Sequence, residues 1–217
     1  MVSAAGGGRQ MRVCIVGQGP SANGHAKLID GCDFVVRIKA YWECGAEDAG
    51  DKIDAWAHYG HPIANPAWEG TPPKIEHWVT HCPGQFADPS EPGGERHSRA
   101  VAHANGQPMR ILTDTLWWQL RKWLNRHPST GMVAAAMAIH ALPLSELVLV
   151  GFDSTTRDRP NYLDAQQHAI IDSHPHDMLT EKKALGSIAD GFWLGAPTKV
   201  KLTWPNKPKL GGGASAA

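Results

Sequence analysis

Short apolar runs alternate along this chain with segments in which apolar residues recur at helical spacing. The apolar runs predict six strands, at residues 12–16, 33–37, 52–59, 74–80, 147–150 and 199–203. Helical spacing or a small-residue composition predicts helices within residues 26–29, 114–126, 133–141, 164–171 and 179–188. Because strands and helices alternate in this way, we predict an α/β fold with a doubly wound, mostly parallel sheet.

The two ends of the chain and one internal stretch lack this alternation. Residues 1–10 and 208–217 include Gly- and Ala-rich runs, which predict flexible tails on either side of a single domain at residues 11–207. Residues 82–107 are rich in Pro, Gly, His and charge and show no periodicity. We therefore expect them to form a mobile lid or loop beside the site, or a disordered segment.

Composition narrows the classes of function. The 217 residues carry 21 basic and 21 acidic side chains, so no basic field favours nucleic acid as a partner. The chain shows no apolar run of transmembrane length and no apolar signal core at its start. Its cysteines lack CxxC spacing, which favours a reduced, cytoplasmic protein, with a disulfide as the open alternative.

Aromatic residues mark the predicted helix at residues 114–126. Thr113 or Asp114 is its expected N-cap. Of the nine tryptophans in the chain, Trp117, Trp118 and Trp123 recur here at helical spacing. We expect these three side chains to belong to the core rather than to a ligand site.

A turn before the apolar helix at residues 133–141 is the strongest candidate for a binding site. In Pro128-Ser129-Thr130-Gly131-Met132, Ser129 is a good N-cap and Gly131 allows close backbone approach. The N–H groups of the first turn and the positive end of the helix dipole therefore predict an anion site. The next strand ends at Gly151-Phe152-Asp153, and ligands bind at the carboxyl ends of strands in open α/β sheets.

A second glycine turn, Gly17-Gln18-Gly19-Pro20-Ser21, directly follows the first strand. Its two glycines let the backbone bend and approach a ligand closely, but the third glycine of a GxGxxG motif is missing at Ala22. A nucleotide-binding turn and a plain tight turn both remain open. Lys39, just beyond the second strand, is either a phosphate contact or a solvated surface residue.

His176 is the candidate general base, because it lies at the expected start of the last long helix. The positive end of a helix favours neutral imidazole, the form that a base requires, although a capping or surface histidine is the open alternative. Glu181 lies five residues further, about 140° around a helix, so the two side chains do not share a face. Glu181 would act through the substrate or a second contact, or else is a solvated acid.

The same stretch supports a rival chemistry. In extended chain, Asp172, His174 and His176 project to one side, and two imidazoles with a carboxylate form a plausible metal set. A metal-dependent hydrolase or phosphotransfer enzyme is therefore an alternative.

Three segments together resemble the sialyltransferases. Residues 13–37, from Val13-Cys14-Ile15-Val16-Gly17-Gln18-Gly19-Pro20-Ser21 to Asp33-Phe34-Val35-Val36-Arg37, resemble the large sialylmotif and the corresponding turn of the small bacterial enzymes. Residues 128–153 are similar to the small sialylmotif. His176-Asp177-Met178-Leu179-Thr180-Glu181 has the His-x4-Glu spacing of the very small motif. The three segments follow one another in the family's order and cover about a third of the chain.

The resemblance implies an inverting, metal-independent glycosyltransferase on a variant Rossmann-like (GT-A-like) fold. It would need no cofactor, and would transfer a sugar from a CMP-sugar donor, normally CMP-sialic acid, to a glycan or lipid-linked sugar. Related 2-keto acids such as Kdo are alternative donors. Carried over by position, Gly17, Gln18 and Gly19 would line the cytidine monophosphate, with Pro20 and Ser21 completing the turn.

The resemblance assigns roles to the other two segments as well. Ser129, Thr130 and Gly131 would hold the donor carboxylate. Gly151, Phe152 and Asp153 would lie by the nucleoside, and Tyr162 would reach the leaving phosphate. His176 would take the proton of the acceptor hydroxyl, with Glu181 as its companion in the motif.

The chain departs from the family pattern at two donor contacts. Gln18 and Lys39 stand where the family usually has asparagine, and Lys39 could pair with a phosphate as a point charge. Cys14 has no cysteine counterpart within residues 128–153, so the disulfide of the animal enzymes is absent. These departures leave a third hypothesis open, a non-catalytic nucleotide-binding domain.

Overall fold

The computed structural model describes residues 9–38, 46–58, 75–80, 107–152 and 178–205. Several predictions lie outside these ranges. They are the two tails for most of their length, the loop at 82–107 apart from Gln107, the helix at 164–171, and the site candidates Lys39, Asp153, Tyr162, Asp172, His174 and His176.

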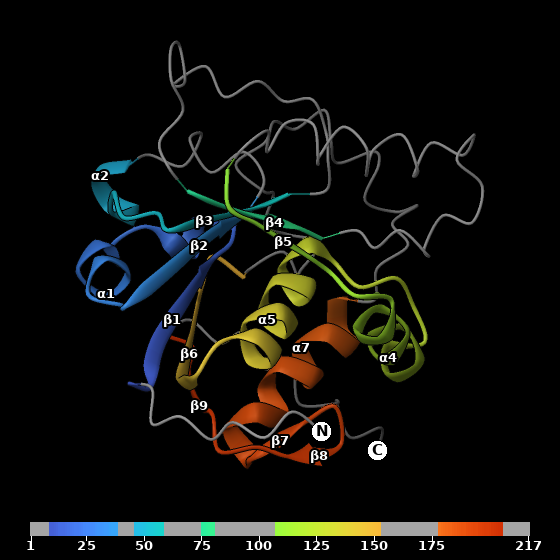
Figure 1. The fold of residues 1–217 in the computed structure, drawn as a ribbon. Helices are drawn as coiled ribbons and strands as arrows, with labels where there is room; N and C mark the ends of the chain where they lie inside the picture. The colour runs from blue at the N-terminus through green and yellow to red at the C-terminus, as the bar shows by residue number, and fades with distance from the viewer. Residues whose placement is uncertain (1–8, 39–45, 59–74, 81–106, 153–177, 206–217) are drawn as a thin grey trace, which may run out of the picture.

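Seven described strands form one sheet in which every pair of neighbours is parallel (Figure 1). Their order across the sheet is β5-β4-β3-β2-β1-β6-β9. Their bounds are β1 Met11–Val16, β2 Phe34–Ile38, β3 Ala55–His58, β4 Glu76–Val79, β5 Met109–Ile111, β6 Leu144–Val150 and β9 Lys201–Thr203. The predicted α/β fold with a parallel, doubly wound sheet is thus confirmed.

The two central strands form because continuous apolar runs can be buried on both faces of a parallel sheet. Side chains alternate between the faces along β1 and β6. Val13, Ile15, Leu147 and Leu149 face one core, whereas Cys14, Val16, Val148 and Val150 face another. The chain winds outward from β1 to β5 and then returns to β6 beside β1. The strand order therefore reverses between β1 and β6, and ligands bind at such a switch point in open α/β sheets.

Helices cover both faces of the sheet (Figure 1). On one face lie α4 (Asp114–Leu124), α5 (Thr130–Ala141) and α7 (Met178–Gly186), and on the other lie the short α1 (Ala26–Asp30) and α2 (Ala46–Ala49). Every residue of α5 from Gly131 to Ala138 is buried, and most are Gly, Ala or Val, so the helix can pack closely on β1, β2, β3 and β6. Thr113 and Ser129 are the N-caps of α4 and α5, as predicted.

The core prediction for the tryptophans is right for one residue and wrong for two. Trp117 is buried, whereas Trp118 is 55% exposed and Trp123 is 37% exposed. α4 buries a single stripe made of Leu116, Trp117, Leu120 and Leu124, and the other two indoles fall outside it.

Some short elements were not predicted. They are β5, α2, the 3₁₀ turns η1 (Pro20–Ala22) and η6 (Ser187–Asp190), and the hairpin of β7 (Phe192–Trp193) with β8 (Ala196–Pro197). None of them exceeds four residues, so each is too short to show a periodic pattern of apolar residues. Among the described helices, none is long and apolar enough to cross a membrane.

Candidate functional site

Two glycine turns interlock where β1 and β6 end. The N–H of Gly17 donates to the carbonyl of Val150 at 2.7 Å, and the N–H of Gly19 donates to the carbonyl of Gly151 at 2.9 Å. A Cβ on Gly17 would lie 2.3 Å from the Gly151 carbonyl oxygen, and one on Gly151 would lie 2.6 Å from the Gly17 carbonyl oxygen. Gly151 also has a φ of +73°. Both positions therefore require glycine, because here one backbone approaches the other.

Gln18, between the two glycines of the first turn, carries an unsatisfied polar group. Its side chain is buried, with 7% exposure, and its Nε2 has no hydrogen-bond partner among the described residues. A buried donor without a partner costs about 1–3 kcal/mol. Such a group at a switch point is suited to a ligand acceptor atom.

The N-terminus of α5 offers backbone donors in the same region. The Oγ of Ser129 accepts a hydrogen bond from the N–H of Met132 at 3.2 Å, and the Ser129 carbonyl accepts from Val133 at 2.9 Å. The N–H groups of Thr130 and Gly131 belong to the first turn, which has no acceptors within its own helix. That these N–H groups bind an anion stays a prediction of the sequence.

Glu181 of α7 already binds one end of this turn. The N–H of Ser129 donates to Oε1 of Glu181 at 2.6 Å, and the Ser129 hydroxyl donates to Oε2 at 2.5 Å. Glu181 is buried, with 4% exposure. The carboxylate thus lies at the positive end of the α5 dipole and takes both donors of Ser129. Of the three residues expected at a donor carboxylate, Ser129 thus uses its N–H and its hydroxyl within the protein.

Phe152 brings the separate segments together. A Cβ on Gly131 would lie 2.8 Å from the Cε1 of Phe152, and one on Gly17 would lie 3.4 Å from its Cδ2. The Phe152 ring therefore contacts both the first glycine turn and the start of α5, and its edge also meets Trp204, with centroids 6.2 Å apart. Gly131 is needed because any side chain there would displace this ring.

Residues 17–19, 129–131, 151–152 and 181 thus form one cluster at the switch point. Ser21 lies in η1, whose Ala22 N–H donates to the Gly19 carbonyl at 3.0 Å. Within the described part of the chain, no group of three or more His, Cys, Asp or Glu residues could hold a metal ion. The predicted metal set of Asp172, His174 and His176 lies outside that part.

The sequence reasoning missed two polar features. The bond between Ser129 and Glu181 joins residues 52 positions apart, and no local pattern indicates it. A second feature is a buried pair on β3 and β4, in which His58 Nε2 and His77 Nδ1 are 3.2 Å apart. The available signal was a histidine in each of two short strands that also carry Trp and other apolar residues, AWAH and EHWV.

Comparison with known proteins identifies the architecture. No family model and no curated protein sequence matches the chain. Among solved structures, the α-2,3-sialyltransferase Cst-I from Campylobacter jejuni is similar over 94% of this chain and 77% of its own, with a TM-score of 0.59 and 17% identity. A mammalian sialyltransferase is similar over 89% of this chain and 69% of its own, with a TM-score of 0.58 and 17% identity.

A third similar structure contains a nucleotide. The sialyltransferase CstII from Campylobacter jejuni, in complex with cytidine-5'-monophosphate, is similar over 91% of this chain and 81% of its own, with a TM-score of 0.55 and 19% identity. The fold of the chain is therefore that of the sialyltransferases.

Proposed function

We propose that the protein is an inverting glycosyltransferase that transfers sialic acid, or a related 2-keto sugar acid, from a CMP-sugar to an acceptor hydroxyl. One observation carries the proposal. The two glycine turns and the N-terminus of α5 meet at the switch point between β1 and β6, beside the Nε2 of Gln18, which has no hydrogen-bond partner among the described residues. The similarity to a sialyltransferase that binds cytidine-5'-monophosphate supports this choice of ligand.

The donor would be held by the groups that the fold leaves available. The Nε2 of Gln18 would donate to the nucleotide, with residues 17–21 lining it. The N–H groups of Thr130 and Gly131 would bind the sugar carboxylate. Glu181 would act as a positioning residue, because its carboxylate fixes Ser129 and so orients the first turn of α5.

The remaining roles fall to residues outside the described ranges. His176 would be the general base, Tyr162 would bind the leaving phosphate, Asp153 would contact the nucleoside and Lys39 a phosphate. His176 precedes α7 by two residues, a chain length that spans about 7 Å at most. The Glu181–Ser129 bonds, which hold α7 at the start of α5, support a base close to the donor.

Three finer features belong to the same proposal. Transfer would proceed without a metal, because a base and a stabilised leaving phosphate suffice for the reaction. A reduced, cytoplasmic setting agrees with Cys14 and Cys32, which are both buried free thiols. The acceptor would be a glycan or a lipid-linked sugar.

The test is release of CMP from CMP-sialic acid and from CMP-Kdo, with CMP binding followed by thermal shift. His176→Ala should lower transfer about 10²–10⁴-fold and leave CMP binding unchanged, because a general base contributes that much. His174→Ala is the matched control and should keep full activity. Full activity of His176→Ala would refute the base.

Turnover in the presence of a metal chelator distinguishes the proposed function from the metal-dependent alternative. Turnover that persists in chelator supports the proposal, whereas turnover that is lost and then restored by zinc indicates a metal site at Asp172, His174 and His176. Tight CMP binding without any release of CMP from either donor indicates a non-catalytic nucleotide-binding domain.

A further inference from the structure

The outer side of α4 exposes two tryptophans to solvent. Trp118 is 55% exposed and Trp123 is 37% exposed, although the helix buries Leu116, Trp117, Leu120 and Leu124 on its inner side. Indole rings are rarely left in water, since each carries a large apolar area. Two of them on one short helix therefore require an explanation.

The hairpin of β7 and β8 extends this surface. A Cβ on Gly195, at the tip of the hairpin, would lie 4.0 Å from the indole Nε1 of Trp123. The hairpin exposes Phe192 by 49%, and Ala196 and Pro197 are also exposed. Trp118 and Trp123 are five positions apart, about 140° around the helix, so they lie at the two edges of its exposed side, with the exposed Gln119 and Lys122 between them. We call Trp118, Trp123, Phe192, Ala196 and Pro197 the tryptophan surface.

Basic side chains border the tryptophan surface. Arg121 and Lys122 lie in the last turn of α4, and Arg126 follows it. The guanidinium of Arg121 lies 5.9 Å from the centroid of the Trp118 ring. The only acid of α4 is Asp114, in its first turn.

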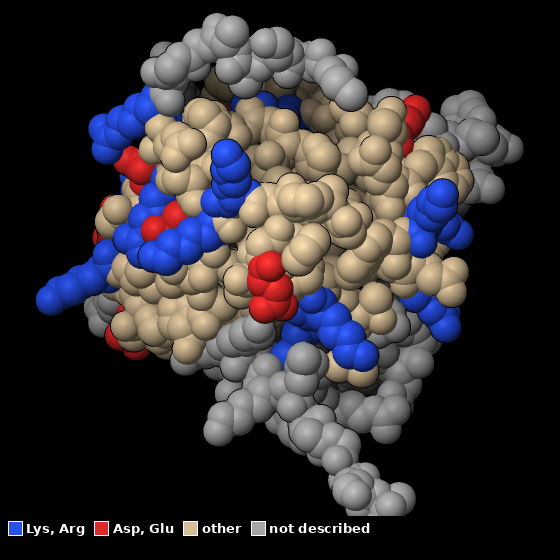
Figure 2. Space-filling view, turned by 90° about the horizontal axis from the view of Figure 1, so that it is seen from below, with Lys and Arg blue, Asp and Glu red and all other residues tan. Residues whose placement is uncertain are grey.

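This positive charge is local, since the chain as a whole has a net charge of zero. Figure 2 shows the side on which β7 and β8 lie, where a wide uncharged area is flanked by Lys and Arg and few acidic side chains interrupt it. The Lys and Arg side chains at the right of Figure 2 are on the side where α4 lies in Figure 1.

We propose that the tryptophan surface binds the head-group region of an anionic lipid membrane. Tryptophan favours the membrane–water interface, where its apolar ring is buried and its N–H stays hydrated. Lys and Arg beside such rings bind anionic head groups, which is how interfacial helices attach. A purely apolar protein partner would leave these cations without counter-charges, so a lipid surface fits the chemistry better.

The surface does not depend on the proposed function. Residues 125–128 connect α4 directly to Ser129, at the start of α5, whereas the hairpin packs at the other end of α5, where the indole N–H of Trp193 donates to His140 at 3.4 Å.

The test is flotation of the purified full chain with phosphatidylcholine vesicles and with vesicles that also contain phosphatidylglycerol. We expect the chain to float only with the anionic vesicles and to be released by salt. Lys122→Gln with Arg126→Gln should lower the partition constant about 25-fold, since each cation near an anionic surface contributes about fivefold. Trp118→Gln with Trp123→Gln should lower it by at least about tenfold. Vesicle binding is measured without donor or acceptor. A loss of vesicle binding can therefore be distinguished from a loss of sugar transfer.

The matched control replaces Arg9 and Lys27, two exposed cations outside α4 and the hairpin, by glutamine and should bind like the parent. The exposed positions of Lys122 and Arg126 keep this pair informative if the tryptophan pair does not fold. The proposal is overturned if the parent does not float with anionic vesicles. It is also overturned if both pairs bind like the parent, or if the tryptophan pair only abolishes self-association in gel filtration.

Discussion

On one face of the sheet α4, α5 and α7 bury a continuous apolar core, whereas on the other face charged side chains hold α1, α2 and their loops through backbone atoms. The first face joins Leu120, Met132, Leu147 and Ile188 with many other buried residues in one cluster. The second has a small cluster around Cys14, to which α1 and α2 contribute Ile29 and Ala49, with the partly buried Leu28 packed against it. The same sheet is thus covered by apolar packing on one side and by polar bonds on the other.

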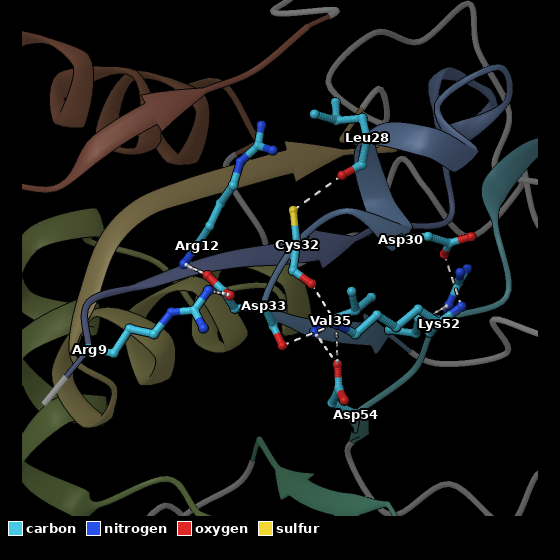
Figure 3. A network of polar contacts seen from close by, with 10 residues as sticks. Arg9, Arg12, Leu28, Asp30, Cys32, Asp33, Val35, Lys52 and Asp54 are labelled. Atoms are coloured by element: carbon cyan, nitrogen blue, oxygen red, sulfur yellow. Dashed lines mark hydrogen bonds and ion pairs between the residues drawn. The ribbon is translucent and has the colours of Figure 1, made fainter.

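The polar face depends on side chains that bind the backbone of distant segments (Figure 3). Asp54 accepts from the N–H of Val35 at 2.8 Å, and Asp30 accepts from the N–H of Lys52 at 3.0 Å. The ammonium of Lys52 in turn donates to the carbonyl of Cys32 at 2.5 Å. Short helices cannot bury enough apolar surface to hold themselves, so these bonds supply what packing does not.

The two faces should therefore respond differently to substitution. On the apolar face, shape and volume matter, and another apolar residue of similar size should be accepted. On the polar face, the position and number of donors matter, and even a residue of the same charge should fail.

Arg37→Met should give the largest loss. The buried guanidinium donates from Nε to the carbonyl of Lys52 at 2.9 Å and from Nη2 to those of Ala49 and Gly50 at 2.9 and 2.6 Å. Removing it leaves these carbonyls without their donor, so we expect the free energy of unfolding to fall by about 3–5 kcal/mol. This change in the free energy of unfolding is measured by urea denaturation. Arg37→Lys should recover little, because an ammonium cannot reproduce the fork. A loss below about 1 kcal/mol for either variant would contradict this account of the polar face.

Leu120→Ala probes the apolar face and should cost about 2–5 kcal/mol in urea unfolding, because Leu120 is fully buried and the cavity would remain. Unlike Arg37→Lys, the conservative variant at this position should keep most of the stability. Leu120→Met should cost less than about 1.5 kcal/mol, since it nearly preserves volume. Equal losses for Met and Ala would show that this face also depends on specific geometry.

The same contrast explains what the sequence could predict. Apolar runs occupy most of β1, β6 and α5 and predict these elements. The N-caps Ser129 and Thr113 have a local sequence signature. Exposure could not be predicted for Trp118 and Trp123, because helical spacing alone does not say which stripe meets the core.

Local sequence patterns could not predict the long-range polar contacts. The glycines at 17 and 151 suggested an approach to a ligand, whereas the structure shows that each backbone approaches the other. The angle around the helix argued against Glu181 as a simple partner of His176, which stays a prediction because His176 lies outside the described residues. It could not show that the carboxylate binds Ser129, because that contact depends on how α7 crosses α5.

Ser129 and Glu181 form a polar contact on the apolar face and should show an intermediate effect. Glu181→Gln keeps the shape but loses one charge-assisted acceptor, so we expect a loss of about 1–2 kcal/mol in urea unfolding. Ser129→Ala should cost a similar amount, because it removes the N-cap as well. The double variant should lose less than the sum, with a coupling of about 1 kcal/mol. Strict additivity would show that the two residues act independently.

The smallest effect should come from pH, through two histidines on the apolar face. Desolvation, and then the nearby Arg121 guanidinium, lower the pKa of His127, and partial burial lowers the pKa of His140. His127 Nε2 lies 2.9 Å from Nη1 of Arg121, and His140 Nε2 accepts from the indole N–H of Trp193 at 3.4 Å. Both contacts need an unprotonated Nε2.

Because the folded pKa values lie below the unfolded value of about 6.5, the unfolded chain takes up protons first as the pH falls. Stability should therefore decrease below about pH 6.5 and level off once the folded form is protonated as well. In His127→Gln with His140→Gln this decrease should be smaller than in the parent in urea unfolding across that range. An unchanged pH profile in the double variant would show that neither imidazole is held neutral by the fold.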